Sequence, residues 1–435
     1  MQIDKITQQD LSIFHHEDDQ SVFHHLNMTT TNSGRNYFRQ LVSQPLNTVE
    51  AIIDTQQTIQ HLLSVMDQWP ESPSNGTIMV MEKYYESPVE TYPNIPDLFN
   101  SAWYRFYHKA DYSLTLFTVQ HAMDFLKGMQ LISQLTAGIK GEHRQFSQRI
   151  QELLNREQIQ PMLQNSKDEL TSIDVLKYAR FIRFQYKSAF TELAEIHAKL
   201  DAYLGMAKAG KKFGFCLPEI ISQPTPYLAA EGLYHFMLQQ PVDYTIQLSM
   251  QEHFLFLTGA NMAGKSTFIK AVGLAVYLAH IGMGVPAKKM RLTCFDGLLT
   301  NIQILDNLAR GESFFFNEVQ RIKNTIEKIS DGKKWLILID ELFKGTNQED
   351  AVKCSTIVIE GLLKMNNALF VLSTHLYEIG AALKQYQNIQ FRFFETAVSD
   401  GQLVFNYQLR EGISNDRLGY LILKREGVVA MLEKL

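Results

Sequence analysis

Apolar residues follow two different patterns in the two halves of the 435-residue chain. Up to about residue 210 they recur mostly at helical spacing, and Phe190, Ile196 and Tyr203 fall on one face of a long amphipathic helix. From about residue 213 onward, short all-apolar runs alternate with helical segments, which is typical of a parallel α/β sheet. We therefore predict a multidomain protein, with a mainly α-helical region over residues 1–212 and an α/β domain over residues 213–435.

Three short runs are the candidates for buried strands of that sheet: "FLFL" at 254–257, "WLILID" at 335–340 and "LFVLST" at 369–374. An almost wholly apolar run suits a parallel strand that is buried on both faces. Polar residues follow each run, and ligands of open α/β sheets bind at the carboxyl ends of the strands. The chemistry of the chain is therefore expected just after these runs.

A glycine loop, "TGANMAGKST" at 258–267, follows the first run and precedes a helical pattern. Gly259 and Gly264 allow the backbone to wrap with its N–H groups pointing inward, Lys265 adds a cation, and Ser266 can ligate Mg²⁺. By chance this pattern arises in roughly 1% of chains of this length. We predict that the loop binds a nucleoside triphosphate at a helix N-terminus. The nucleotide-binding residues are expected to be Gly259, Ala260, Asn261, Met262, Ala263, Gly264, Lys265, Ser266 and Thr267.

Two acidic residues, Asp340 and Glu341, end the second run. Adjacent carboxylates are costly in an apolar environment, so they do not mark a simple buried strand end. A solvated strand end is the alternative, but the glycine loop upstream favours a functional site. We expect Asp340 to hold Mg²⁺ and Glu341 to orient and polarise the attacking water.

His375 stands just past the third run, where it can reach a γ-phosphate. Between the glycine loop and the acidic pair, Ser313 begins a helical segment whose N-terminal amides can face an anion. The order of these elements is that of ATPases that hold ATP between two subunits, one giving the loop and the other a serine-led helix.

Several motifs together resemble the MutS mismatch-repair family, a branch of the ABC ATPases. They are "TGANMAGKST", "VPAKK", "LARGESFF", "LILIDELFKGTNQEDA" and "STHLYEI", and residues 18–59 look like the start of the family's core, or lever, domain. The resemblance implies a P-loop ATPase domain of the ABC type that uses ATP and Mg²⁺. It also implies a homodimer in which Ser313 acts on the partner's ATP, with Glu341, His375 and Ser313 as the catalytic residues.

The chain also departs from the family pattern. It begins almost directly at the core-like region. Of its three Phe-x-Glu sequences, the one at 190–192 falls inside the long helix predicted above, and those at 316–318 and 393–395 lie in the ATPase half. Recognition of mismatches by the family's Phe-x-Glu wedge is therefore not expected. Phe343 and Lys344 replace the family's glycine and arginine after the acidic pair, and Ala263 replaces a loop glycine. The residue that stacks on adenine is not identified, although Tyr244 is a candidate.

The net charge of −5 offers no basic excess of the kind that a DNA-binding domain usually has. The resemblance favours DNA binding in repair or recombination, whereas the charge favours a dimeric, ATP-switched regulator of a protein partner. A small-molecule kinase fits poorly, because kinases do not need Ser313 and His375 in this order. The aromatic residues of 101–112, which lie among basic ones, are expected in a helix–helix core, with stacking on nucleic acid as the alternative.

Location can also be predicted from the sequence. The three cysteines, Cys216, Cys294 and Cys354, have no paired or metal-type spacing, which suits a reducing compartment. The N-terminal residues lack the layout of a signal peptide, and the apolar stretch near 271–287 contains His280 and Pro286. We expect a cytoplasmic protein without a membrane partner.

Overall fold

The computed structural model describes residues 1–87, 92–93, 96–302, 314–399, 402–414 and 428–432. The chain forms two compact units. The first, called the sheet unit, comprises residues 1–25, 44–53 and 212–435, and the second, called the helical unit, comprises residues 26–43 and 54–211. A mainly helical region and an α/β region are therefore both present, as predicted. The first 25 residues, expected in the helical region, instead pack with the sheet unit.

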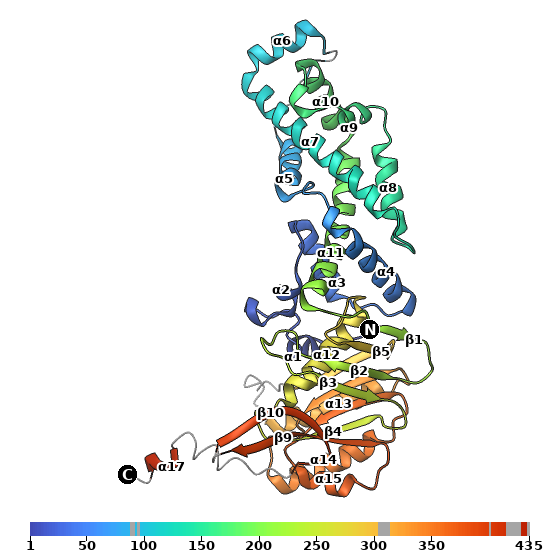
Figure 1. The fold of residues 1–435 in the computed structure, drawn as a ribbon, viewed down its shortest axis with the longest axis vertical. Coiled ribbons are helices and arrows are strands. Elements are labelled where there is room, and N and C mark those ends of the chain that lie inside the picture. The colour runs from blue at the N-terminus through green and yellow to red at the C-terminus, as the bar shows by residue number, and fades with distance from the viewer. Residues whose placement is uncertain (88–91, 94–95, 303–313, 400–401, 415–427, 433–435) are drawn as a thin grey trace. The chain divides into compact units, whose positions relative to one another are not determined.

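The helical unit contains no β-strand among its described residues. Its elements, coloured blue to green in Figure 1, are α3 (Asn32–Ser43), α4 (Val49–Val65, which begins in the sheet unit), η2 (Met66–Gln68), α5 (Asn75–Glu86), α6 (Leu98–Tyr107), α7 (Lys109–Thr136), α8 (Arg144–Leu154), α9 (Gln160–Gln164), η3 (Lys167–Glu169), α10 (Ser172–Gln185) and α11 (Lys187–Phe213).

Helix α11 is the long helix predicted from the apolar spacing, and a buried carboxylate holds the chain before α3 against it. Asp201 on α11 is fully buried and accepts hydrogen bonds from the amide and hydroxyl groups of Thr30 and Thr31, at 2.7–3.1 Å. A buried carboxylate is stable only when such donors compensate for its lost hydration. Asp201 therefore fixes the start of α3 on α11.

Helix α6 does not form the aromatic helix–helix core that we expected. Tyr104 is buried, but Trp103, Phe106 and Tyr107 on the same helix are exposed, Phe106 by 78%. The helical character expected for this region is present, but the sequence could not show that one side of α6 is exposed. The expectation of a core was wrong for these three side chains.

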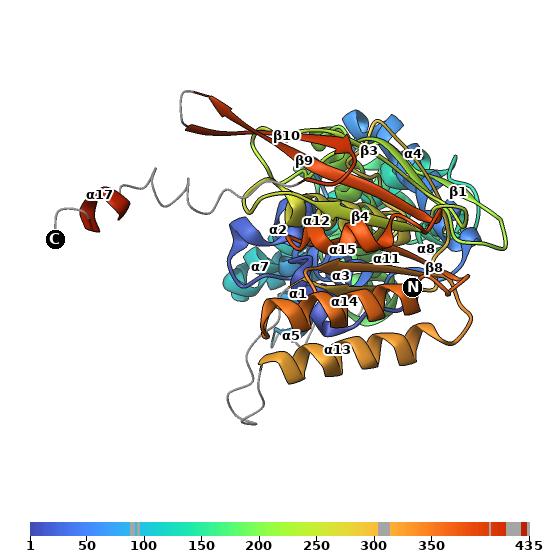
Figure 2. The ribbon, with the colours of Figure 1, turned by 90° about the horizontal axis from the view of Figure 1, so that it is seen from below.

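The sheet unit contains two sheets and the helices that cover them (Figures 1 and 2). The four-stranded sheet has the order β1-β5-β2-β3, and the six-stranded sheet has the order β10-β9-β4-β8-β7-β6. The strands are β1 (Glu219–Ile221), β2 (Leu228–Leu233), β3 (Tyr244–Leu248), β4 (Phe254–Thr258), β5 (Lys289–Thr293), β6 (Gly297–Asn301), β7 (Trp335–Asp340), β8 (Ala368–Ser373), β9 (Ile389–Ser399) and β10 (Gln402–Glu411). The helices are α1 (Lys5–Asp10), η1 (Asp18–Gln20), α2 (Val22–Leu26), α12 (Lys265–His280), α13 (Phe314–Ile329), α14 (Gln348–Leu362), α15 (Tyr377–Leu383) and α17 (Val428–Leu432).

The six-stranded sheet is the middle layer of the sheet unit. Strands β9, β4, β8, β7 and β6 are parallel to their neighbours, as predicted, and only the hairpin of β9 with β10 is antiparallel. Ile337 and Ile339 on β7 belong to a core with α13, α14 and α15, which follow one another across that face in Figure 2. Leu338, between them, faces α12 at Gly273. Helices therefore cover β7 on both faces, which explains its continuous apolar run.

The N-terminal residues add a short edge to the sheet beyond β6. Gln2 forms a parallel bridge with Gly297, and α1 packs against β6. Asp10, at the end of α1, accepts hydrogen bonds from the hydroxyl of Thr300 at 2.6 Å and the amide of Ile302 at 3.0 Å. These contacts explain why the first residues belong to the sheet unit.

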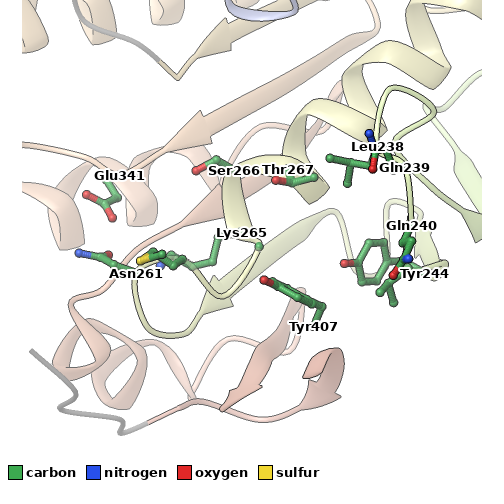
Figure 3. Close-up of a pocket in the computed structure, with 13 residues that line it drawn as sticks. Leu238, Gln239, Gln240, Tyr244, Asn261, Lys265, Ser266, Thr267, Glu341 and Tyr407 are labelled. Atoms are coloured by element: carbon green, nitrogen blue, oxygen red, sulfur yellow. The ribbon is translucent and has the colours of Figure 1, made fainter. Parts of the chain in front are cut away.

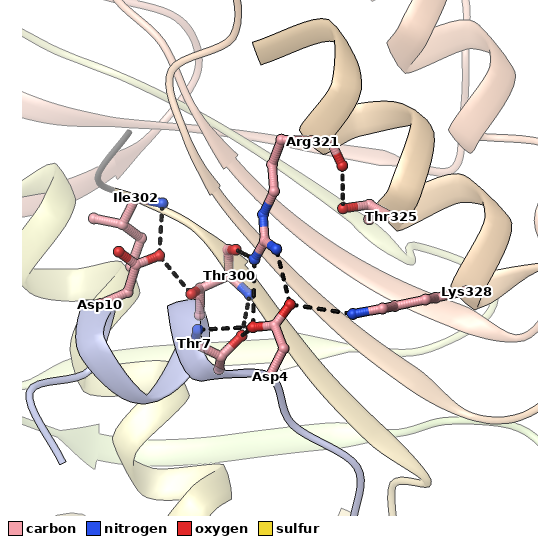
Figure 4. A network of polar contacts seen from close by, with 8 residues as sticks. All are labelled: Asp4, Thr7, Asp10, Thr300, Ile302, Arg321, Thr325 and Lys328. Carbon is pink, nitrogen blue, oxygen red and sulfur yellow. Dashed lines mark hydrogen bonds and ion pairs between the residues drawn. The ribbon is translucent and has the colours of Figure 1, made fainter. Parts of the chain in front are cut away.

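Asp4 joins the start of α1 to helix α13 (Figure 4). Its carboxylate caps α1 through the Thr7 amide at 2.8 Å and pairs with Arg321 at 2.8 Å and Lys328 at 3.2 Å. Burial alone would raise the pKa of Asp4, but the hydrogen bonds from Arg321 and Thr7 lower it below its ordinary value. The charged form of Asp4 therefore stabilises the folded sheet unit.

No helix in the described part of the chain is both long enough and apolar enough to cross a bilayer.

We predict that Asp4→Ala lowers the free energy of unfolding of the sheet unit by about 2 kcal/mol at pH 7, because Arg321 loses a partner and α1 loses its cap. Trp335 lies on β7, so its fluorescence during urea denaturation reports on this unit once Trp69 and Trp103 have been replaced by phenylalanine.

The matched control is Asp243→Ala, which removes an ion pair with Lys288 whose two side chains are largely exposed. It should change the free energy of unfolding by less than ~0.5 kcal/mol. Because the pKa of Asp4 is lowered by folding, its contribution is complete above the unfolded pKa and is lost as the pH falls through the folded one. Equal stabilities of Asp4→Ala and wild type at pH 7 would contradict the assignment.

Candidate functional site

Three neighbouring parallel strands end at the same edge of the six-stranded sheet. Strand β8 lies between β4 and β7, and the register pairs Ser373 with both Leu257 and Asp340. The glycine loop follows β4, the acidic pair ends β7, and His375 follows β8. The pairing therefore brings together the three predicted motifs that follow the apolar runs.

The loop after β4 has the left-handed backbone conformations that its glycines allow. Gly259 has φ 144° and Gly264 has φ 104°, and the second of these immediately precedes α12. A Cβ atom at Gly264 would lie 3.3 Å from the ring of Tyr407, so the position is restricted by space as well as by φ. Met262, at the exposed tip of the loop, also has a positive φ of 69°.

Lys265 is the first residue of α12, and its ammonium group lies under the loop. It donates hydrogen bonds to the carbonyl oxygens of Gly259 at 2.7 Å and Ala260 at 3.0 Å. Burial lowers the pKa of Lys265, and the carboxylates of Glu341 and Asp340 offset part of this effect. The loop thus encloses a cation at the N-terminus of a 16-residue helix, a suitable place for an anion.

Asp340 is buried at the end of β7 and is bound by two hydroxyl groups. Ser266 donates to one of its carboxylate oxygens and Ser373 donates to the other. Ser266 and Asp340, the two predicted metal ligands, are therefore in direct contact. Both present hard oxygen atoms of the kind that Mg²⁺ prefers, and they can hold such an ion together with oxygens of a bound ligand.

Glu341 takes a left-handed conformation, with φ 67°, and turns its side chain toward His375 and Lys344. Its carboxylate lies 3.4 Å from Nδ1 of His375 and 3.5 Å from Nζ of Lys344. Burial would raise the pKa of Glu341, but the hydrogen bond from His375 and the positive charges around it lower the pKa to about 2. Glu341 is therefore ionised at neutral pH and suited to orienting a water molecule.

A cavity of about 580 Å³ lies beside the glycine loop (Figure 3). This volume is within the usual range for sites that bind small molecules. It is lined by Leu238, Gln239, Gln240, Val242, Tyr244, Asn261, Met262, Gly264, Lys265, Ser266, Thr267, Glu341 and Tyr407.

The sequence did not predict two parts of this wall. Residues 238–242 connect β2 to β3, and Tyr407 interrupts β10 at a bulge where its φ is 54°. Nothing in the sequence around Tyr407 reveals the bulge that directs it toward the loop. Tyr244 also lines the cavity, but its ring is mostly buried against Phe268 and Phe394.

Ser313, the remaining predicted catalytic residue, lies outside the described residues. Within the described part of the chain, no group of three or more His, Cys, Asp or Glu residues is arranged to hold a metal ion. A cation at Ser266 and Asp340 would therefore take further oxygen ligands from the bound molecule or from water. The site as described can bind a polyanion with a small divalent cation and place Glu341 beside it.

Comparisons with known proteins point to one family. Residues 255–431 match the family model for MutS domain V. The DNA mismatch repair protein MutS of Thermus aquaticus is 31% identical over 242 residues, and that of Lactococcus lactis subsp. cremoris is 27% identical over 300 residues.

These matches cover 55% and 67% of the chain but only 29% and 35% of the two relatives. A third MutS, from Petrotoga mobilis, is 25% identical over 277 residues, which are 62% of the chain and 34% of that protein. The chain is therefore similar to MutS proteins, matches the model of MutS domain V over residues 255–431, and spans about a third of the length of these relatives.

Proposed function

We propose that this protein binds ATP with Mg²⁺ in the 580 Å³ cavity and hydrolyses it. The observation that carries the proposal is the convergence of Lys265, the Ser266–Asp340 pair and Glu341 at the carboxyl ends of β4 and β7. The nucleotide-binding domain comprises residues 213–435, together with the N-terminal residues that pack on it.

The loop binds the phosphates through its backbone amides and through Lys265. The ammonium group of Lys265 now contacts two loop carbonyls, and a phosphate oxygen gives it a better partner at the same place. Ser266 and Asp340 hold Mg²⁺, which, when bound, neutralises charge on the phosphate oxygens. Tyr407 and residues 238–242 are placed to contact the rest of the nucleotide.

Glu341 orients the water molecule that attacks the terminal phosphorus. Its low pKa makes it a weak proton acceptor at neutral pH, so we assign it mainly to positioning and polarising the water. His375, at 3.4 Å from Glu341, senses the terminal phosphate, and both side chains stay in place through their mutual contact.

A second subunit completes the site. We propose a homodimer in which Ser313 of one chain acts on the nucleotide held by the loop of the other. The described residues of helix α13 begin at the next residue, Phe314, and the N-terminus of this helix would face that nucleotide. Hydrolysis across this interface would drive a lever movement of the helical region.

DNA is the proposed partner, because the relatives are named DNA mismatch repair proteins. The exposed aromatic side chains of α6, with the exposed Arg105 and Lys109 beside them, offer a surface that can stack on bases. None of the three Phe-x-Glu sequences offers a wedge. In the one at 190–192, Phe190 is buried and Glu192 pairs with Arg149. Glu318 is buried and accepts hydrogen bonds from the amides of residues 344 and 345. Glu395 is bound by Asn406 and Arg410.

We predict that Glu341→Gln retains ATP binding but hydrolyses ATP at least ~10²-fold more slowly, since the amide no longer orients and polarises the water as a carboxylate does. Steady-state phosphate release and equilibrium ATP binding measure the two effects separately. Glu327→Gln is the matched control, because Glu327 is an exposed residue of α13. Equal turnover of Glu341→Gln and wild type would remove Glu341 from the mechanism.

We also predict complementation between two inactive chains, Lys265→Ala and Ser313→Arg. Each homodimer lacks one part of every site, whereas the mixed dimer contains one site with both wild-type parts. ATPase activity should therefore appear on mixing. No recovery, despite proven exchange of subunits, would contradict a shared site.

DNA binding should weaken steeply as salt rises and should distinguish a G·T mismatch from matched duplex by less than threefold, about 0.6 kcal/mol. Titrations of both duplexes at two salt concentrations, with and without ATP, test this. A tenfold mismatch preference would show that another part of the chain replaces the wedge. Absence of binding under all conditions would favour the ATP-switched regulator of a protein partner.

A further inference from the structure

A buried carboxylate ties the loop that follows β7 to helix α13. Glu318 on α13 is only 1% exposed, and its two oxygens accept hydrogen bonds from the amides of Lys344 at 2.9 Å and Gly345 at 3.0 Å. Buried backbone amides and buried carboxylates both need such partners. Each side of this contact therefore holds the other in place.

Phe343 adds a second tie between the same two elements. Its φ is 58°, in the left-handed region that is unfavourable for a bulky side chain, and the MutS resemblance has glycine at this position. The ring is 5% exposed and lies 5.6 Å from the ring of Phe315 on the first turn of α13. Burial of the ring against Phe315 offsets the backbone strain. A glycine at position 343 would have no such strain, but it would also lack the contact with Phe315.

The loop after β7 and helix α13, which these contacts join, each begin beside a different functional residue. The loop starts at Glu341, whose carboxylate contacts His375 and Lys344. The backbone amide of Lys344 donates a hydrogen bond to Glu318. The described residues of helix α13 begin at Phe314, which follows Ser313 in the sequence. Glu318 and Phe343 therefore connect the loop beside Glu341 to helix α13.

We propose that Glu318 and Phe343 are positioning residues that couple nucleotide occupancy at Glu341 to the position of α13, and the proposal rests on the function proposed above. In the proposed dimer, Glu341 serves the nucleotide of its own chain, whereas α13 faces the nucleotide of the partner. Through Glu318 and Phe343, nucleotide binding at one site would therefore change the position of the α13 helix that faces the nucleotide of the other site.

Hydrogen exchange of the full-length protein, followed by mass spectrometry with and without adenylyl imidodiphosphate and Mg²⁺, tests this coupling. In the wild type, the nucleotide analogue should slow exchange at least twofold in two segments, 341–347 and 315–322. In Glu318→Ala the change in 341–347 should remain, and the change in 315–322 should vanish.

Phe343→Gly is the second variant, because it relieves the strained φ and keeps the Glu318 contact, so it tests the link even if Glu318→Ala does not fold. It should reduce the change in 315–322 by at least half. The matched control is Glu327→Ala, an exposed position on the same helix, which should respond as the wild type does.

The outcomes separate the coupling from a purely structural role. If both segments still respond in Glu318→Ala and Phe343→Gly, or if 315–322 does not respond in the wild type, the coupling is overturned although the analogue binds. If calorimetry detects no binding of the analogue to the wild type, the proposed function fails, and the coupling fails with it.

Discussion

The pairing of β8 with β4 on one side and β7 on the other is the constraint on which the described part of the site depends. Its register sets Ser373 opposite both Leu257 and Asp340. A shift by one residue would turn Asp340 into the opposite layer and separate it from Ser266, because successive side chains of a strand point to opposite faces. The apolar side chains on both faces of β7 resist such a shift, since helices cover each face.

Helix α13 is the element on which most of the unexpected contacts meet. Asp4, at the start of the chain, holds its later turns through Arg321 and Lys328, and the loop after β7 holds its first turns through Glu318. The helix is thus held by the side chain of Asp4 and by the backbone amides of residues 344 and 345, from segments more than 20 residues away in the sequence. The Glu318 hydrogen bonds and the Phe315–Phe343 contact both connect this helix to the loop beside Glu341.

The departures from the MutS pattern have different consequences. Ala263 is buried in the loop without preventing the hydrogen bonds of Lys265. Lys344 contributes a positive charge near Glu341 and helps to lower its pKa. Phe343 takes a conformation that suits glycine and uses its ring to contact α13, so this substitution changes how the loop is held.

The sequence by itself determined the mainly helical and α/β regions, the three parallel strands and the residues that follow them. These features depend on local patterns: continuous apolar runs, glycines at a tight loop and acids at a strand end. Only the tertiary structure decided the strand register, the bulge that directs Tyr407, the packing of α1 on β6 and the exposure of one side of α6. The contacts of Glu318 with residues 344 and 345 belong to the same group. Periodicity shows that a helix has an apolar side, but the partner of that side, or of a buried carboxylate, is chosen by segments distant in the chain.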